Sequence, residues 1–472
     1  MAKKINNYNL FLKLSFIILF IAIWLSLDTN FENILNFNGY FSLTNLILVI
    51  RCLAPFAIFF FIYVLLLKET KIIDSVKLNK NINFLVYIFF SFLILQIISH
   101  LISGNKLIFL YYFFPSFFLL FYFNFAAKNN LLTISFYISI GILFILFVIF
   151  SVLSLKHFFT SGDLHFYGTF PNVYKSILSI STNVIRSSGL SRTALLIYMP
   201  LFLYLLITPA SKFKLVINFF LMFIILLTQS RLTNIYWPIF IIFSSIIYLR
   251  DQNFFKYVKK IIIIIIIPFV ITGAVISTKY YLIYHQIILV DSKNKIIGLK
   301  IFDDPKLSYV KEGFEYKISS NKKIDDIAVI REVDPLTYSS GRIDYWKKIL
   351  KRNDRQLIGN GYLGDRYLLE NDNASNLIFY TYASSGLLGT FAIIFLVIRC
   401  IFICIDVVFF EQIKLNKKNL IPISSIFYLG FIVFRGIGEN SLAVFSIDQV
   451  IFLQSFIIIE IFRFKLKRNE KK

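Results

Sequence analysis

The sequence predicts an all-α polytopic membrane protein with about 12 transmembrane helices and one large outer loop domain between the ninth and tenth spans. Two observations lead to this fold class. The 472 residues are 58% hydrophobic, with a mean hydropathy of +0.74, which is more apolar surface than a soluble chain of this length can bury. Many segments also approach or exceed the roughly 20 apolar residues that cross a hydrocarbon core.

The positions of basic residues predict the orientation of the spans. Lysine and arginine are concentrated in the segments on one side of the predicted spans. These segments include Lys3, the ranges 68–81 and 250–260, and the tail 463–472. The positive-inside rule assigns that side to the cytoplasm, with both termini inside. The predicted spans are 10–27, 45–67, 84–101, 107–126, 131–154, 193–208, 215–229, 232–249, 261–280, 385–408, 420–437 and 446–464.

This topology divides the chain into three parts. Residues 1–280 hold spans one to nine and a shorter outer loop at 155–191, residues 281–376 form the large outer loop, and residues 377–472 hold spans ten to twelve and a basic cytoplasmic tail. Within the large loop, the middle alternates enough to allow a few short strands. Its end predicts an amphipathic helix with Ile343, Trp346, Ile349 and Leu350 on one side.

Composition also argues against several functional classes. The net charge of +23 does not indicate nucleic-acid binding, because membrane topology explains many of the lysines in short loops. The three cysteines, Cys52, Cys400 and Cys404, fall in apolar spans without metal-ligand spacing. We therefore expect no disulfide framework, no metal and no cofactor.

Arg231 interrupts the apolar run "FIILLTQSRLTNIYWPIFII". An arginine at the centre of a bilayer costs about 2.5–3.5 kcal/mol, so we split the run at 229–231 into two spans joined by a tight outer turn. Arg231 then lies at the outer face. Taken alone, it could be an arginine at the end of a span whose charge reaches the interface.

Several other charged residues fall on the same outer face. Arginine forks match phosphate oxygens and keep their charge, so the set predicts a site for a lipid-borne phosphate or diphosphate. Each arginine by itself could instead contact a lipid headgroup or form an ion pair. Besides Arg231, the set comprises Arg186, Arg192, Arg342, Arg435 and Glu439.

Two further segments carry polar or glycine-rich patterns. "GNGYLGDR" at 359–366 is a weak phosphate-loop candidate, because no Walker lysine or strand–turn–helix context accompanies it, and a tight turn returning to the membrane fits better. Polar residues also crowd the start of the apolar helix within 370–395, where free N–H groups favour an anion. Capping by Asn373 or Ser375 would explain them equally well.

Together these motifs resemble the O-antigen polymerase and ligase superfamily of bacterial surface-polysaccharide assembly. The resemblance covers roughly residues 180–400, and the first five spans match only as generic apolar helices. Its motifs are R-x-x-G before a span, S-R at a tight outer turn, and a large outer loop with G-R-x-x-x-W, G-x-G and a polar-Asn pair before G-x-x-G. They correspond to Arg186 to Gly189, Ser230-Arg231, Gly341-Arg342 with Trp346, Gly359 with Gly361, and Ser375-Asn376 with Gly386 and Gly389.

The resemblance implies an enzyme of the bacterial inner membrane that acts at the periplasmic face. The family transfers glycans from undecaprenyl diphosphate without a nucleotide sugar or a metal. Arg231 and Arg342 would stabilise the diphosphate, with Arg186 assisting. The implied partners are an undecaprenyl-diphosphate-linked oligosaccharide, membrane lipid and a chain-length regulator, but no nucleic acid. The other expected substrate-binding residues are Arg192, Trp346, Asn376, Arg435 and Glu439.

One position departs from the family pattern. Ligases of the family have a histidine where this chain has Ser375, just before Asn376. Serine is no general base near neutral pH, so another group must take the proton, or this branch does not use that histidine. This favours a polymerase over a ligase, with a flippase or other transporter as the third hypothesis. The candidate bases are Asp372, slightly preferred, and Glu370, Glu439, His157 and His165.

Overall fold

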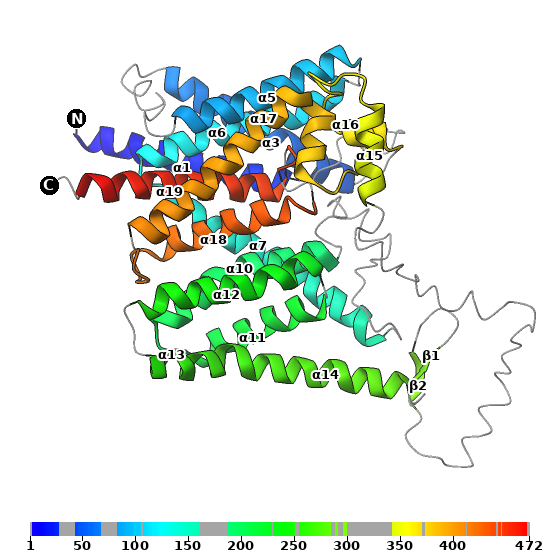
Figure 1. Ribbon diagram of the computed structural model, residues 1–472. Coiled ribbons are helices and arrows are strands. Elements are labelled where there is room, and N and C mark those ends of the chain that lie inside the picture. The colour runs from blue at the N-terminus through cyan, green and yellow to red at the C-terminus, as the bar shows by residue number, and fades with distance from the viewer. Residues whose placement is uncertain are drawn as a thin grey trace, which may run out of the picture.

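The chain folds into a bundle of long helices with a small, partly helical segment at one end (Figure 1). The computed structural model describes residues 2–27, 43–67, 83–104, 107–160, 187–228, 230–250, 254–284, 288–290, 296–299, 342–370, 373–411, 413–439, 442–444 and 446–469. The bundle consists of α1 (Ala2–Ser26), α3 (Leu43–Leu67), α5 (Asn83–Ile102), the 3-10 helix η1 (Leu107–Tyr112), α6 (Phe113–Lys128), α7 (Leu132–Thr160), α10 (Ser187–Ile207), α11 (Lys212–Leu227), α12 (Arg231–Leu249), α13 (Phe254–Ile261), the π-helix η2 (Ile262–Ile266), α14 (Ile267–Tyr284), α17 (Leu377–Ile405), the π-helix η6 (Asp406–Phe410), α18 (Leu420–Arg435) and α19 (Ile447–Asn469).

Every predicted span coincides with helical structure. Among the residues that the structure describes, eight helical segments are long and apolar enough to cross a membrane, as a polytopic helical membrane protein requires. The number of twelve crossings stays a prediction. Several helices begin earlier than the predicted spans, among them α10 at Ser187 instead of residue 193 and α17 at Leu377 instead of residue 385. The hydropathy pattern missed these first turns because they contain polar residues.

The helices run along a common direction. The start of α1 and the end of α19 lie at the same end of the bundle, as an even number of crossings requires (Figure 1). The opposite end carries α15 (Arg342–Arg352), α16 (Gly364–Leu368) and an antiparallel hairpin of β1 (Ile288–Val290) and β2 (Ile296–Leu299). The hairpin agrees with the short strands expected in the large loop, and the remainder of 300–341 lies outside the described residues. Most residues of α10, α18 and α19 are buried, so these helices form the centre of the bundle.

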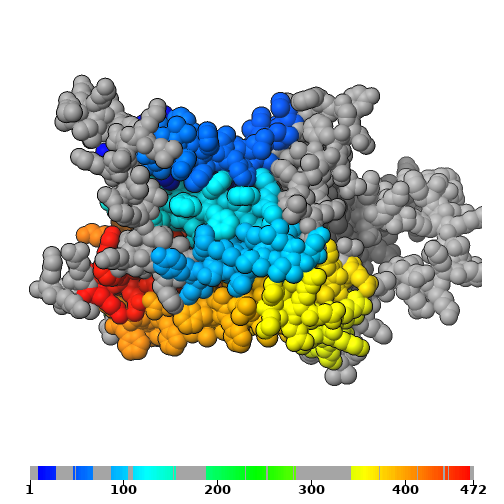
Figure 2. All heavy atoms as spheres, turned by 90° about the horizontal axis from the view of Figure 1, so that it is seen from above, coloured from blue at the N-terminus to red at the C-terminus, as the bar shows by residue number. Residues whose placement is uncertain are grey.

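A break inside α17 anchors the large loop on the bundle. Gly386 has φ +62° and ψ −163°, which interrupts the helical hydrogen bonds. The returning loop supplies replacements: Asn360 N donates to Ala383 O and Leu387 N donates to Gln356 O, both over 2.8 Å. Within a membrane, a broken helix is tolerated only where such partners satisfy its backbone. Figure 2 shows α15 and α16 in yellow at the end of α17, beside α5.

The glycines of 359–366 serve this packing. Gly359 and Gly361 both have φ +82°, and a methyl group added at Gly361 would lie 2.4 Å from His100 Cα of α5. The segment therefore acts as a tight turn that lets two backbones approach closely, as the sequence favoured over a phosphate loop.

Replacing Gly361 with alanine is expected to lower the free energy of unfolding by about 1–3 kcal/mol from backbone strain alone, and the clash with α5 adds to the loss. Thermal unfolding of the purified protein in detergent measures it. Gly141→Ala is the matched control, because a methyl group there meets nothing within 4 Å. Equal melting temperatures for the two variants would contradict the packing described above.

The amphipathic helix predicted at the end of the loop is α15, but its buried side differs from the prediction. Ile349 is fully buried and Trp346 is half-buried, as expected. Ile343 and Leu350, however, are 46% and 53% exposed. The reason is that α15 rests on the 374–383 segment through the face that holds Tyr345, Trp346 and Ile349.

Candidate functional site

Several of the predicted site residues lie at or next to one short turn, 435–439, which follows α18. Gly438 N donates to Arg435 O over 3.0 Å and closes the turn. Leu377 N donates to Gly436 O over 2.8 Å, and Asn376 Nδ2 donates to Ile437 O over 2.9 Å. These bonds fix the start of α17 against the turn.

A buried ion-pair network lies on one side of the turn. Asp448, in the first turn of α19, is 2% exposed and accepts hydrogen bonds from both Arg192 and Arg435. The Arg192 Nη1–Asp448 Oδ1 distance is 3.3 Å. Two arginines therefore share one carboxylate, so the network is net positive. Within the described part of the chain, Nε and Nη2 of Arg192 are buried and have no hydrogen-bond partner.

Arg342 packs against Gly438 of the same turn. A methyl group added at Gly438 would be 3.0 Å from both Nη1 of Arg342 and Cδ1 of Leu232. The missing side chain of Gly438 thus lets the guanidinium pack on the turn, next to the first residues of α12. Arg231 is exposed at the start of that helix. Neither Arg231 nor Arg342 forms an ion pair with any residue that the structure describes.

Two of the expected substrate-binding residues have structural contacts. Trp346 Nε1 donates to Ala374 O over 2.8 Å, and the indole stacks on Phe379 with ring centroids 5.0 Å apart. Asn376 is the N-cap of α17, with Oδ1 accepting from the backbone of Ile378 and Phe379 at 2.8 and 3.1 Å. Trp346 therefore fixes α15 against α17, and Asn376 fixes the start of α17 against the turn.

Asn376→Ala is expected to lower the free energy of unfolding by about 1–2 kcal/mol, because it removes a helix cap and the bond to Ile437 O. Asn376→Asp retains the capping oxygen and loses only the donor to Ile437, so it should lose less. Melting temperatures of the two purified variants test this order. If both variants have the melting temperature of the wild type, the helix cap and the hydrogen bond to Ile437 O contribute nothing to stability.

The remaining candidate site residues lie in different environments. Ser375 has φ +45° and its hydroxyl donates to Asn373 Oδ1. Glu439 is half-buried and acts electrostatically on Arg435. Glu370 is exposed and pairs with Arg352 at 2.9 Å, so its charge is partly neutralised. Arg186, Asp372, His165 and the side chain of His157 lie outside the described residues.

Asp448 is the residue that sequence reasoning missed. The signal was available, because an acidic residue in an apolar span is costly and usually has a cationic partner inside the bundle. It lies in "SIDQVIF", at the predicted edge of the last span. Arg192 was expected at the membrane edge, whereas it lies in the second turn of α10, buried against Asp448.

The combined electrostatics favour an anion. Arg192, Arg231, Arg342 and Arg435 outnumber the carboxylates Asp448 and Glu439 around the turn. Three helices, α12, α17 and α19, also begin here, and the positive ends of helix dipoles attract negative groups. Among the described residues, no group of three or more His, Cys, Asp or Glu side chains is placed to hold a metal ion.

Comparisons with protein-family models, with curated proteins and with solved structures find no match to this chain.

Proposed function

We propose that this protein is a membrane glycosyltransferase that polymerises O-antigen or a related surface polysaccharide. The observation that carries the proposal concerns Arg342 and Arg231, beside the turn held by Asp448, neither of which forms an ion pair with a residue that the structure describes. Guanidinium groups without such a partner at the end of an apolar bundle suit the diphosphate of a lipid-linked glycan. The order of motifs shared with the O-antigen polymerase and ligase superfamily supports the same assignment.

The proposed reaction joins two lipid-linked glycans. A hydroxyl oxygen of the acceptor repeat unit attacks the anomeric carbon of the donor glycan. The bond between that carbon and the diphosphate oxygen breaks, a glycosidic C–O bond forms, and undecaprenyl diphosphate leaves with the electron pair. The acceptor proton passes to a base, for which Asp372 is our preferred candidate.

The arginines would act on the leaving group. Negative charge on the bridging oxygen grows as the bond breaks, and fixed donors in a site that excludes water stabilise it most. Arg231 and Arg342 would hold the diphosphate, with Arg186 assisting. Arg192 and Arg435 are bound to Asp448, so we assign them to fixing the turn and to long-range attraction of the anion.

We place the protein in the bacterial inner membrane with both termini in the cytoplasm and the site at the periplasmic face. The support is the lysine and arginine pattern, together with the location of α15 and α16 at the end of the bundle opposite to both termini (Figure 1). The remaining proposed partners are membrane lipid and a chain-length regulator.

A gel of surface polysaccharide tests the proposal. Cells that lack the gene are compared with cells complemented by the wild type or by Arg231→Ala. A polymerase predicts that the ladder of long chains collapses to single capped units in the deletion strain and in the Arg231→Ala strain. Only the wild type should restore the ladder.

The same gel separates the alternatives. If the protein is a ligase, cells that lack it will keep long polymer on the lipid carrier, with none attached to lipid A core or protein. If it is a flippase, cells that lack it will keep single repeat units on the cytoplasmic side, so that no capped unit appears at the surface. Either outcome would contradict the polymerase assignment.

A further inference from the structure

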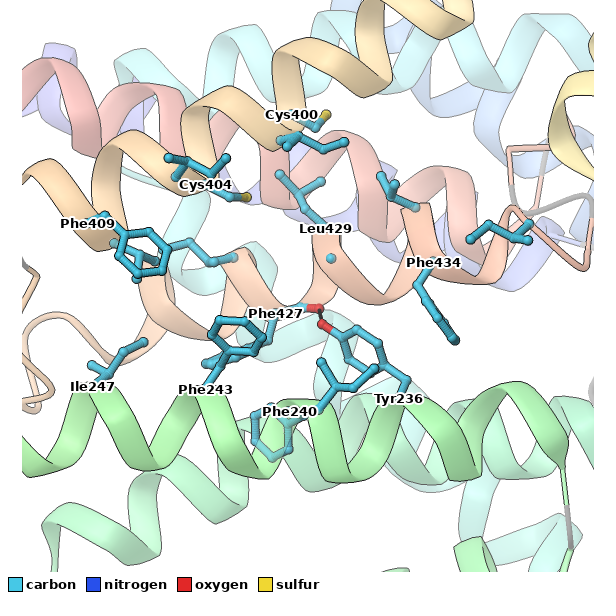
Figure 3. Close-up of a pocket in the computed structure, with 18 residues that line it drawn as sticks. Tyr236, Phe240, Phe243, Ile247, Cys400, Cys404, Phe409, Phe427, Leu429 and Phe434 are labelled. Carbon is cyan, nitrogen blue, oxygen red and sulfur yellow. Dashed lines mark hydrogen bonds between the residues drawn. The ribbon is translucent and has the colours of Figure 1, made fainter.

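An apolar groove runs between α12 on one side and α17 and α18 on the other (Figure 3). Its volume is about 420 Å³, within the range of ligand pockets. Phe240 and Phe243 of α12 and Cys404 of α17 are among its lining residues. Phe243 is 42% exposed, so the groove opens sideways towards the surrounding lipid.

The hydroxyl group that lines the groove is satisfied by a hydrogen bond within the protein. Tyr236 Oη, which points into the space between the helices, donates a 2.8 Å hydrogen bond to Phe427 O. This contact depends on Gly430, because a methyl group there would lie 2.7 Å from the hydroxyl. The result is a predominantly apolar surface that suits a hydrocarbon, with its one hydroxyl group already bonded to the protein.

One end of the groove meets the candidate site. Ile437 lines the groove, and the Arg342 guanidinium packs against the next residue, Gly438. From Tyr236 the groove continues along α12 to Ile247, which is about 16 Å at 1.5 Å per residue. The Arg342 guanidinium thus lies next to one end of the apolar groove.

We propose that this groove holds the prenyl chain of the lipid whose diphosphate binds at Arg342, an inference that rests on the proposed function. The geometry matches a ligand with one flexible hydrocarbon chain and a multiply charged head. A phospholipid fits less well, because it has two acyl chains and a single phosphodiester charge for several arginines. Burying the chain would align the diphosphate with Arg342 and Arg231 and so orient the bond to be broken.

The test uses the full-length protein in nanodiscs and an undecaprenyl diphosphate that carries a diazirine on its chain. After irradiation, mass spectrometry maps the labelled peptides. Cys404→Trp and Val433→Trp fill the groove from two different helices. Phe402→Trp is the matched control, because Phe402 lies on α17, is 64% exposed and is not part of the lining. A phospholipid with a diazirine on one acyl chain is the second probe.

We expect the prenyl probe to label residues 236–247, 400–409 and 426–437. Each filling variant should reduce that labelling about tenfold, corresponding to a loss of about 1.4 kcal/mol in binding, while Phe402→Trp leaves it unchanged. Equal labelling of these residues and of exposed α3 would overturn the proposal. So would a phospholipid probe that labels the groove as strongly as the prenyl probe does.

The failures of the two proposals are distinguishable. If Arg231→Ala collapses the polysaccharide ladder but the prenyl probe ignores the groove, the polymerase assignment stands and the groove assignment is wrong. If the probe labels the groove but the ladder survives Arg231→Ala, the groove binds prenyl lipid and the polymerase assignment is wrong.

Discussion

Replacing Arg342 with alanine is expected to reduce the rate of chain extension about 100- to 1,000-fold, the usual cost of removing one donor that stabilises transition-state charge. The guanidinium packs on Gly438 without an ion-pair partner among the described residues, so its charge is available to a ligand. Arg342→Lys should recover only part of the rate, because an ammonium group cannot bind two phosphate oxygens through a planar fork. The rate of polymer growth in membranes from cells carrying each variant measures the effect.

Arg355→Ala is the control for this prediction. Arg355 belongs to the same loop, but its guanidinium donates to Ser103 Oγ over 2.6 Å, away from the turn. Its removal should leave the rate unchanged. Arg342→Ala should also have the melting temperature of the wild type, because Arg342 forms no ion pair with a described residue. If the Arg342 and Arg355 variants lose activity equally, Arg342 has no special role towards the diphosphate.

The second large effect is expected from Asp448. Asp448→Ala removes the one carboxylate that the buried Arg192 and Arg435 share, and breaking a buried pair typically costs about 3–5 kcal/mol. The variant should therefore show a much lower melting temperature in detergent and a lower yield of folded protein. The ladder of long chains should shorten with it, because the 435–439 turn is held by Arg435.

Two variants test the cause of that loss. Asp448→Ala combined with Arg192→Met removes one of the stranded charges and should recover part of the stability. Asp406→Ala removes a carboxylate that is 20% exposed and pairs with Arg463 and Lys467 at the opposite end of the bundle, so it should cost much less. An equal loss for Asp406→Ala, or no recovery in the double variant, would contradict the charge argument.

Hydropathy was sufficient to predict the helices. Apolar runs of about 20 residues have few structural solutions in a membrane, and each predicted span coincides with a helix. The extra turns of α10 and α17 escaped prediction because polar residues there are satisfied locally. Asn376, for example, caps α17, which hydropathy alone cannot distinguish from a loop residue.

The sequence predicted which arginines lie near one another better than it predicted their contacts. Charge and topology placed Arg192, Arg342 and Arg435 on one face, and the structure brings all three to the 435–439 turn. The division of roles depends on tertiary packing that spacing does not encode. Whether an arginine meets the buried Asp448 or packs against Gly438 is decided by helices distant in sequence.

The most direct test of the central claim uses purified protein in liposomes with a fluorescent, lipid-linked repeat unit as the only substrate. We predict a ladder of longer lipid-linked glycans and the release of one undecaprenyl diphosphate for each new glycosidic bond. Arg342→Ala should abolish both the ladder and the release. If the wild-type protein moves the labelled lipid between leaflets but forms no ladder and releases no undecaprenyl diphosphate, the protein is a transporter and the account is wrong.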